Sequence, residues 1–315
     1  MKRLFLFLFV WVLAAACVFA AGMPVAAAKT RPNTSAIMVD ELIGKSISQV
    51  AAEFGKPARV DASEFAFNWH VFNGDYKRFL MAGVDGGTVV AVYCNSQYLL
   101  SKGAIKIGTD RAMVRELLGA PITTKRIGNT VYVFPNTDRK DIFLIDGYYY
   151  YYYYDVFNKY KVTSVMIVKQ EYEEELLGKP LALSDAAAAA YSRQSADLVN
   201  SIRARNGLNT LSHYGKAAAF ALTRSEDMRD RAYFSHYTPE GNSPAFLARK
   251  YGITYRTLCE NIAYGHRNAI NAFEAFMNSK GHRKNILNKV KQIGVGTAAG
   301  GDRSVIVTYT LLIKK

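Results

Sequence analysis

The feature that most constrains the fold of this chain is an internal repeat. The segment LIGKSISQVAAEFGKP, 42–57, recurs as KIGTDRAMVRELLGAP, 106–121, with a constant offset of 64 residues. The matched pairs are Gly44/Gly108, Val50/Val114, Gly55/Gly119 and Pro57/Pro121. Each copy predicts one short helix, because Ser46 or Asp110 can cap its start and the glycine and proline end it.

Three strand-like runs follow each predicted helix. They cover 65–72, 78–84 and 89–94 in the first unit and 130–134, 141–145 and 160–168 in the second. The Asp85–Gly87 segment, DGG, is typical of a hairpin turn. Two tandem α-β-β-β units predict a duplicated α+β domain over residues 40–170, with a shared or paired sheet. No acid, histidine or cysteine grouping in this domain suits chemistry.

Seven consecutive tyrosines, Tyr148–Tyr154, lie between strands of the second unit. Side chains in a strand alternate between its faces, so at most half of these rings can enter one core. One interpretation is an aromatic platform for sugars or a partner. The other is a long hairpin arm, turning near residues 155–158, whose outer rings are amphipathic cover.

A change of composition at residues 171–185, with Gly178 and Pro180, predicts a linker. Residues 186–315 then form a second domain, whose first helix begins at the linker's end. The predicted helices cover 185–205, 216–231, 244–251 and 269–280, the last ended by Gly281, and 293–298 and 304–313 form a hairpin. Helices on both sides of a small antiparallel sheet are expected.

The N-terminal segment predicts export. Residues 1–28 combine a basic start, an apolar run and small residues before Lys29, as in a secretory signal peptide. Two alternatives stay open: the apolar run is long enough for an uncleaved membrane anchor, and Cys17 lies in a sequence similar to a lipoprotein cleavage site. Beyond this segment only Cys94 and Cys259 remain, which excludes a disulfide scaffold and a structural zinc module.

The charge of the chain bears on its partners. The formal net charge is +14. In an exported protein the natural polyanions are cell-wall polymers and anionic lipid headgroups, while the plainer interpretation is solubility alone. Export and the absence of interleaved aromatic residues argue against nucleic acid as the partner of the basic segment 282–288.

Three ionisable residues lie where the local structure is predicted to end: His236, Glu260 and His282. Such positions are those that a rigid scaffold presents to a ligand. Cys259, beside Glu260, suggests either a nucleophile or, as we expect, an inert buried thiol.

Residues 197–310 resemble the CAP superfamily of cysteine-rich secretory, antigen 5 and pathogenesis-related proteins, in its bacterial SCP-like branch. The resemblance rests on LVNSIRARNGLNTL, SEDMRDRAYFSH, CENIAYG, FMNSKGHRKNIL and IGVG, in that order. The duplicated domain resembles the CAP-associated N-terminal domain at IGKSISQVAAEFGKP and IKIG. The resemblance implies a C-terminal α-β-α sandwich with a cleft lined by a His/Glu/Glu/His tetrad.

Three members of that tetrad match His236, Glu260 and His282. Ser279 stands where the second glutamate is expected, so the implied ligand cleft is His236, Glu260, Ser279 and His282. Glu274 lies about 140° around its helix from Ser279 and cannot share the cleft, so we interpret it as a solvated residue.

His236 and His282, with Glu260, could hold zinc or another divalent metal, but no carboxylate would then remain to act as general base. The two histidines could instead be structural residues bonded to Glu260 and the backbone, or independent surface residues.

The leading hypothesis is a secreted CAP-domain protein of the cell envelope whose cleft binds a small ligand or divalent metal, without strong catalysis. The enzymatic alternative is a metal-dependent hydrolase of peptides or cell-wall material that uses His236, Glu260 and His282 as catalytic residues. A third hypothesis is a lipid-binding or adhesion module that makes contact through the tyrosine run and the basic surface.

Overall fold

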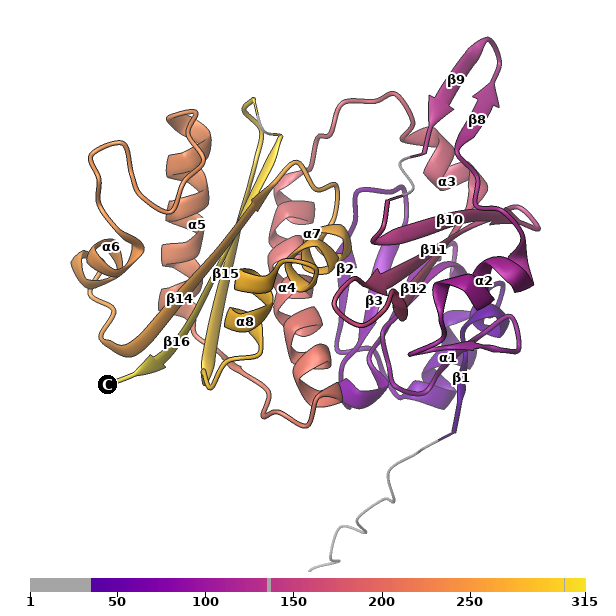
Figure 1. Ribbon diagram of the computed structural model, residues 1–315, viewed down its shortest axis with the longest axis horizontal. Coiled ribbons are helices and arrows are strands. Elements are labelled where there is room, and N and C mark those ends of the chain that lie inside the picture. Colours follow the sequence, from indigo (N-terminus) through magenta and orange to yellow (C-terminus); the bar gives the residue numbers. More distant parts are fainter. Residues whose placement is uncertain (1–34, 135–136, 303) are drawn as a thin grey trace, which may run out of the picture. The chain divides into compact units, whose positions relative to one another are not determined.

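The computed structural model describes residues 35–134, 137–302 and 304–315 (Figure 1). The predicted signal peptide, with its anchor and lipoprotein alternatives, lies outside these ranges. Within them, no helix is both long and apolar enough to cross a membrane.

One seven-stranded sheet combines both repeats, in the order β10-β11-β12-β5-β4-β3-β2. Its strands are β2 (Arg59–Ala62), β3 (Asn68–Phe72), β4 (Leu80–Asp85), β5 (Thr88–Cys94), β10 (Lys140–Ile145), β11 (Tyr148–Asp155) and β12 (Lys161–Lys169). Each unit contributes a meander, and the last strands of the two, β5 and β12, pair antiparallel at the centre. The predicted duplication is therefore visible as two meanders that share one sheet.

The repeated glycines have matching structural roles. The Gly44 and Gly108 N–H groups donate to the carbonyls of Val89 and Val162, each at 2.9 Å, and both glycines have a positive φ. Glycine adopts this left-handed conformation at little cost, which explains its recurrence.

The repeat helices are α1 (Ile47–Phe54) and α2 (Arg111–Leu118). Ser46 caps α1, as predicted, and the structure shows that it forms a capping box with Gln49. The predicted cap at Asp110 is wrong: its side chain makes no cap hydrogen bond and instead lies 3.1 Å from the Lys161 Nζ.

Smaller elements surround the large sheet. They are β1 (Ile37–Met38), η1 (Val39–Leu42), η2 (Tyr76–Arg78), β6 (Leu99–Ser101), β7 (Ile105–Lys106), β8 (Thr124–Ile127), β9 (Thr130–Val133) and α3 (Gln170–Glu175). The prediction missed β2, and it placed 130–134 among the strands of the main sheet, whereas β9 pairs only with β8. The predicted linker 171–185 begins within α3, where Tyr172 is buried.

The tyrosine run forms most of β11 and is buried on both faces. Tyr149, Tyr151 and Tyr153 join the hydrophobic cluster shared with the C-terminal half, while Tyr150, Tyr152 and Tyr154 join a second cluster with α1 and α2 residues. Rings 149 to 154 are at most 5% exposed. Both interpretations from sequence are thus wrong about the outer rings, because each face of this sheet is covered by another layer.

The C-terminal half is an α-β-α sandwich, as predicted. Its elements are α4 (Asp185–Arg205), β13 (Ser212–His213), α5 (Gly215–Asp230), α6 (Pro244–Lys250), β14 (Tyr255–Tyr264), α7 (Ala269–Met277), α8 (Lys280–Ile286), β15 (Gln292–Ala299) and β16 (Val305–Lys314). The sheet order is β13-β15-β16-β14, with α5 on one face and α4, α7 and α8 on the other (Figure 1). Strand β14 was not predicted.

Close packing of α5 on the sheet depends on two glycines. A Cβ atom at Gly294 would lie 2.2 Å from the backbone of Ala217, and one at Gly296 would lie 2.0 Å from the backbone of Leu222. Real Cβ atoms do not approach backbone this closely, so both positions require glycine.

The predicted helix 269–280 is two helices. Helix α7 ends at Met277, and α8 begins at Lys280, so Gly281 lies in the first turn of α8 instead of ending a helix. His282 therefore lies on a helix that is separate from the one bearing Phe276.

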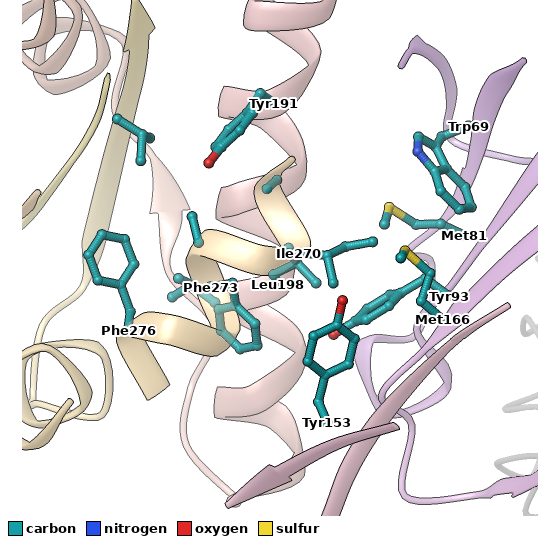
Figure 2. Packing of buried hydrophobic residues seen from close by; sticks show 14 of the residues in the cluster. Trp69, Met81, Tyr93, Tyr153, Met166, Tyr191, Leu198, Ile270, Phe273 and Phe276 are labelled. Carbon is teal, nitrogen blue, oxygen red and sulfur yellow. The ribbon is translucent and has the colours of Figure 1, made fainter. Parts of the chain in front are cut away.

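An apolar cluster joins the large sheet to the C-terminal helices. Figure 2 shows Tyr93, Tyr153 and Met166 of the large sheet beside Leu198 of α4 and Ile270 and Phe273 of α7. Polar contacts accompany it: Asp197 of α4 accepts hydrogen bonds from Tyr76, Asn73 and Arg59.

The interpretation of Glu274 as a solvated residue is wrong. Glu274 is 4% exposed and accepts hydrogen bonds from Ser164 Oγ at 2.6 Å, Tyr93 at 3.3 Å and Thr163 at 3.3 Å. Burial raises its pKa. The helix face opposite Ser279 points to a neighbouring layer of protein, which the sequence of α7 alone does not reveal.

Candidate functional site

His236, Glu260 and His282 come from three different elements and lie together. His236 follows α5 in a loop, Glu260 lies within β14, and His282 lies in α8. The His236 Nδ1 is 2.9 Å from Glu260 Oε1. Burial, and next the neighbouring His236, lower the pKa of His282. We call these three residues with Arg224 the histidine site.

Glu260 is held from both sides. Arg224 Nε donates to Glu260 Oε2 at 3.2 Å, and the side chains of both residues are only 3% exposed. Burial alone would lower the pKa of Arg224, but the Glu260 carboxylate and the Tyr233 hydroxyl together outweigh that effect and the pKa is raised. With Nδ1 protonated, His236 donates to the other carboxylate oxygen, so neither oxygen is without a partner.

Arg224 also fixes the loop that carries His236. Its Nη2 donates to the carbonyls of Ser235 and His236, at 3.2 and 3.1 Å, and its Nη1 to Tyr233 Oη at 2.7 Å. Sequence reasoning missed this residue. The sequence does contain a signal for it, since Arg224 lies on the same face of α5 as the buried residues Phe220 and Met228. A buried cation requires an acidic partner, so an arginine on this face indicates an ion pair.

His282 is positioned by packing and by its backbone. Its ring lies edge-on to Phe276, with centroids 4.9 Å apart. Its carbonyl accepts from Asn261 Nδ2 at 3.1 Å, and the Asn261 Oδ1 accepts from Asn285 at 2.9 Å. These bonds attach α8 to β14, the strand of Glu260.

Ser279, at the position of the expected second acid, is the N-cap residue of α8. It makes no side-chain cap hydrogen bond, and its carbonyl accepts from the Arg283 N–H at 2.8 Å. A serine in place of a carboxylate leaves Glu260 as the acid of this site.

The chemistry open to the site follows from the free ring nitrogens. When Nδ1 of His236 faces Glu260, its Nε2 is the nitrogen left for a ligand, and the side chain is 46% exposed. A metal-binding histidine usually donates its other ring N–H to a carboxylate, which fixes the tautomer and the orientation of the ring. In the described part of the chain, no group of three histidine, cysteine or acidic side chains is arranged to hold a metal. The site itself offers two imidazoles.

Cys259, expected from sequence to be a buried inert thiol, is partly buried. Burial raises the pKa of its thiol, and its polar neighbour is Asn288 Nδ2 at 3.8 Å. A raised thiol pKa disfavours the nucleophilic thiolate.

Comparison with protein families agrees with this architecture. The CAP-associated N-terminal model matches residues 43–178, and the cysteine-rich secretory protein family (CAP) model matches residues 196–312. The two models together span most of the chain.

Individual relatives agree as well. The chain is 29% identical over 275 residues to YlbC of Bacillus subtilis, an uncharacterized membrane protein, covering 81% of this chain and 79% of YlbC. It is 40% identical over 114 residues to YkwD of the same organism, covering 36% of this chain and 44% of YkwD.

Two crystal structures have the same fold. An extracellular SCP-domain protein from Bacillus anthracis superposes with a TM-score of 0.75 at 25% identity, covering 92% of this chain and all of that one. A cysteine-rich secretory protein from Staphylococcus aureus gives a TM-score of 0.72 at 19% identity, covering 89% and 97%. The chain therefore combines a CAP-associated N-terminal domain with a domain of the cysteine-rich secretory protein family (CAP), and its fold is that of the bacterial SCP-domain protein.

Proposed function

We propose that this protein is exported to the bacterial cell envelope and that its histidine site binds a small ligand or a divalent metal ion such as zinc, without strong catalysis. Export rests on the predicted signal peptide and on relatives described as extracellular or membrane proteins. The basic charge favours anionic cell-wall polymers or lipid headgroups as neighbours.

The observation that carries the binding role is the double engagement of Glu260. Arg224 holds one carboxylate oxygen and His236 the other, so Glu260 orients an imidazole and is poorly placed to take a proton from water. Ser279 supplies no carboxylate to replace it. General-base catalysis needs a group within hydrogen-bond reach of the proton that it removes.

A metal would be held by the Nε2 of His236 and by the imidazole of His282. A bound divalent ion would supply Lewis acidity, and Glu260 would keep the His236 ring in the tautomer that binds metal. The adjacent Arg224 cation and the missing second acid both favour weak binding. Protonation of the two imidazoles would oppose it.

The test is a calorimetric titration of the full chain with zinc chloride. His282→Ala removes one imidazole, and His213→Ala is the matched control because His213 lies exposed on β13. We expect heat from the unmodified protein and from the control, and its loss in His282→Ala. Equal heats in all three proteins would contradict metal binding at this site.

Hydrolysis remains the second candidate because a carboxylate 2.9 Å from an imidazole is the pair that orients a histidine base. Turnover of peptidoglycan or peptides that disappears in Glu260→Gln would favour it over simple binding. The adhesion hypothesis loses its tyrosine contacts, since that run is buried.

A further inference from the structure

Part of the C-terminal sheet has an unpaired edge. Strand β15 is covered on its outer side only by the two-residue strand β13, opposite Gln292 and Ile293. No other strand of the described residues lies along the rest of that edge, from Gly294 to Ala299. Figure 1 shows β15 with α5 on one side of the sheet and α4 on the other.

Two hydrogen bonds identify the residues that face this edge. The Tyr214 N–H donates to the Ile293 carbonyl at 2.9 Å, and Arg229 Nη1 donates to the Ala299 carbonyl at 3.2 Å. Main-chain groups alternate in direction along a strand, so those of Val295 and Thr297, between these ends, face the same way. Within the described ranges, neither residue has a main-chain partner on this side.

These main-chain groups lie along a cavity. Val295 is 6% and Thr297 is 5% exposed, and a cavity of about 600 Å³ runs beside them between α4 and α5. Ala189 and Ser192 on one side and Ala219 and Leu222 on the other line it with small or apolar side chains. Leu222 keeps 38% of its surface exposed. The volume is within the range of about 300–1,000 Å³ typical of ligand sites.

The pattern of these groups selects the kind of occupant. Buried main-chain donors and acceptors require partners, and here they alternate at the spacing of a strand. A neighbouring strand lies about 4.8 Å away, whereas a helix needs about 10 Å of width and cannot reach the donors. A second extended backbone is the partner that satisfies both the main-chain N–H donors and the main-chain carbonyl acceptors of this edge.

We propose that this cavity is a docking groove for an extended polypeptide segment, which adds a strand to β15 beyond β13. Its side chains would be small or β-branched where they face the alanines. Asp185 and Glu226 line the cavity together with Arg193 and Arg229, so its charges balance and recognition rests on the main-chain groups.

The test uses the full chain and a defined set of fluorescent heptapeptides built from alanine, valine and threonine with one terminal lysine. Each binding peptide is compared with two analogues, N-methylated at odd or at even amides. Strand addition uses alternate amides only, so one analogue should lose at least tenfold in affinity and the other should bind as the parent does. Equal binding of both analogues, or no peptide binding below about 1 mM, would overturn the proposal.

Two protein variants locate the binding. Ala189 is exposed and lines the cavity, so Ala189→Trp should fill it and weaken peptide binding at least tenfold. Ala186→Trp is the matched control, on an exposed position of α4 outside the cavity. Amide exchange at Val295 and Thr297 should slow when peptide is added. Identical affinities for the two variants would place the peptide elsewhere and refute the groove.

Discussion

Removing the Arg224 side chain tests the central electrostatic feature of the histidine site. In Arg224→Met the Glu260 carboxylate stays buried, with a side chain only 3% exposed, but loses its cationic partner. Breaking one side of a buried ion pair costs about 3–5 kcal/mol, a large part of the roughly 5–15 kcal/mol that stabilises a folded domain. The lost bonds to the Ser235 and His236 carbonyls and to Tyr233 favour the upper end of this range.

The assay is urea unfolding followed by circular dichroism, with a double-mutant cycle. Adding Glu260→Gln to Arg224→Met removes the buried charge, so we expect the double variant to recover at least about 1 kcal/mol relative to Arg224→Met alone. The control is Lys179→Met, which breaks an exposed pair with Glu175 and should cost no more than about 0.5 kcal/mol. An Arg224→Met cost below about 1 kcal/mol, or no recovery in the double variant, would refute the reasoning.

Three further predictions concern the rest of the fold. Burial raises the pKa of Glu64 to about 7 from 4.5, so the carboxyl ionises at lower pH in the unfolded chain than in the folded one. The free energy of unfolding should therefore fall as pH rises from about 4.5 to about 7, by at most about 3.4 kcal/mol. Glu64→Gln should flatten that part of the pH–stability curve, and an unchanged curve would contradict the assignment. Gly296→Ala should prevent the close packing of α5 on the sheet and lower the melting temperature strongly. The control is Gly281→Ala, whose added Cβ meets open space in α8 and should leave the melting temperature unchanged or raise it. Equal melting temperatures of the two variants would count against this packing. Tyr152→Phe removes a buried hydrogen bond of 2.8 Å to Ser101 and should cost about 1 kcal/mol in urea unfolding, while Tyr148→Phe, at the start of the strand, should cost less.

Local signals in the sequence predicted the repeat and the C-terminal helices well. The paired glycines indicated a backbone conformation that other residues avoid, and Ser46 caps its helix as expected. Ser184, Ser243 and Asn268, residue types that favour this position, cap three other helices. These features depend on neighbours a few residues away. The fold class followed from them.

Features that depend on a second layer of protein were not predictable in this way. Glu274 and the outer tyrosines looked solvent-facing because the periodicity of one element does not show what packs on its other face. The same limit hid Arg224, whose partner Glu260 lies 36 residues further along the chain. The split between α7 and α8 was not predicted, because a glycine such as Gly281 is typical of a helix end, whereas here it lies in the first turn of α8.

The tautomer of His236 is the most direct test of the role proposed for the histidine site. It is measured by imidazole ¹⁵N NMR at neutral pH during a zinc titration. We predict a proton on Nδ1, facing Glu260, an unprotonated Nε2, and zinc-dependent shifts at the Nε2 of His236 and in the ring of His282. In Glu260→Gln the preference for this tautomer should weaken. A proton on Nε2 in the unmodified protein, or rings that do not respond to zinc, would contradict the account.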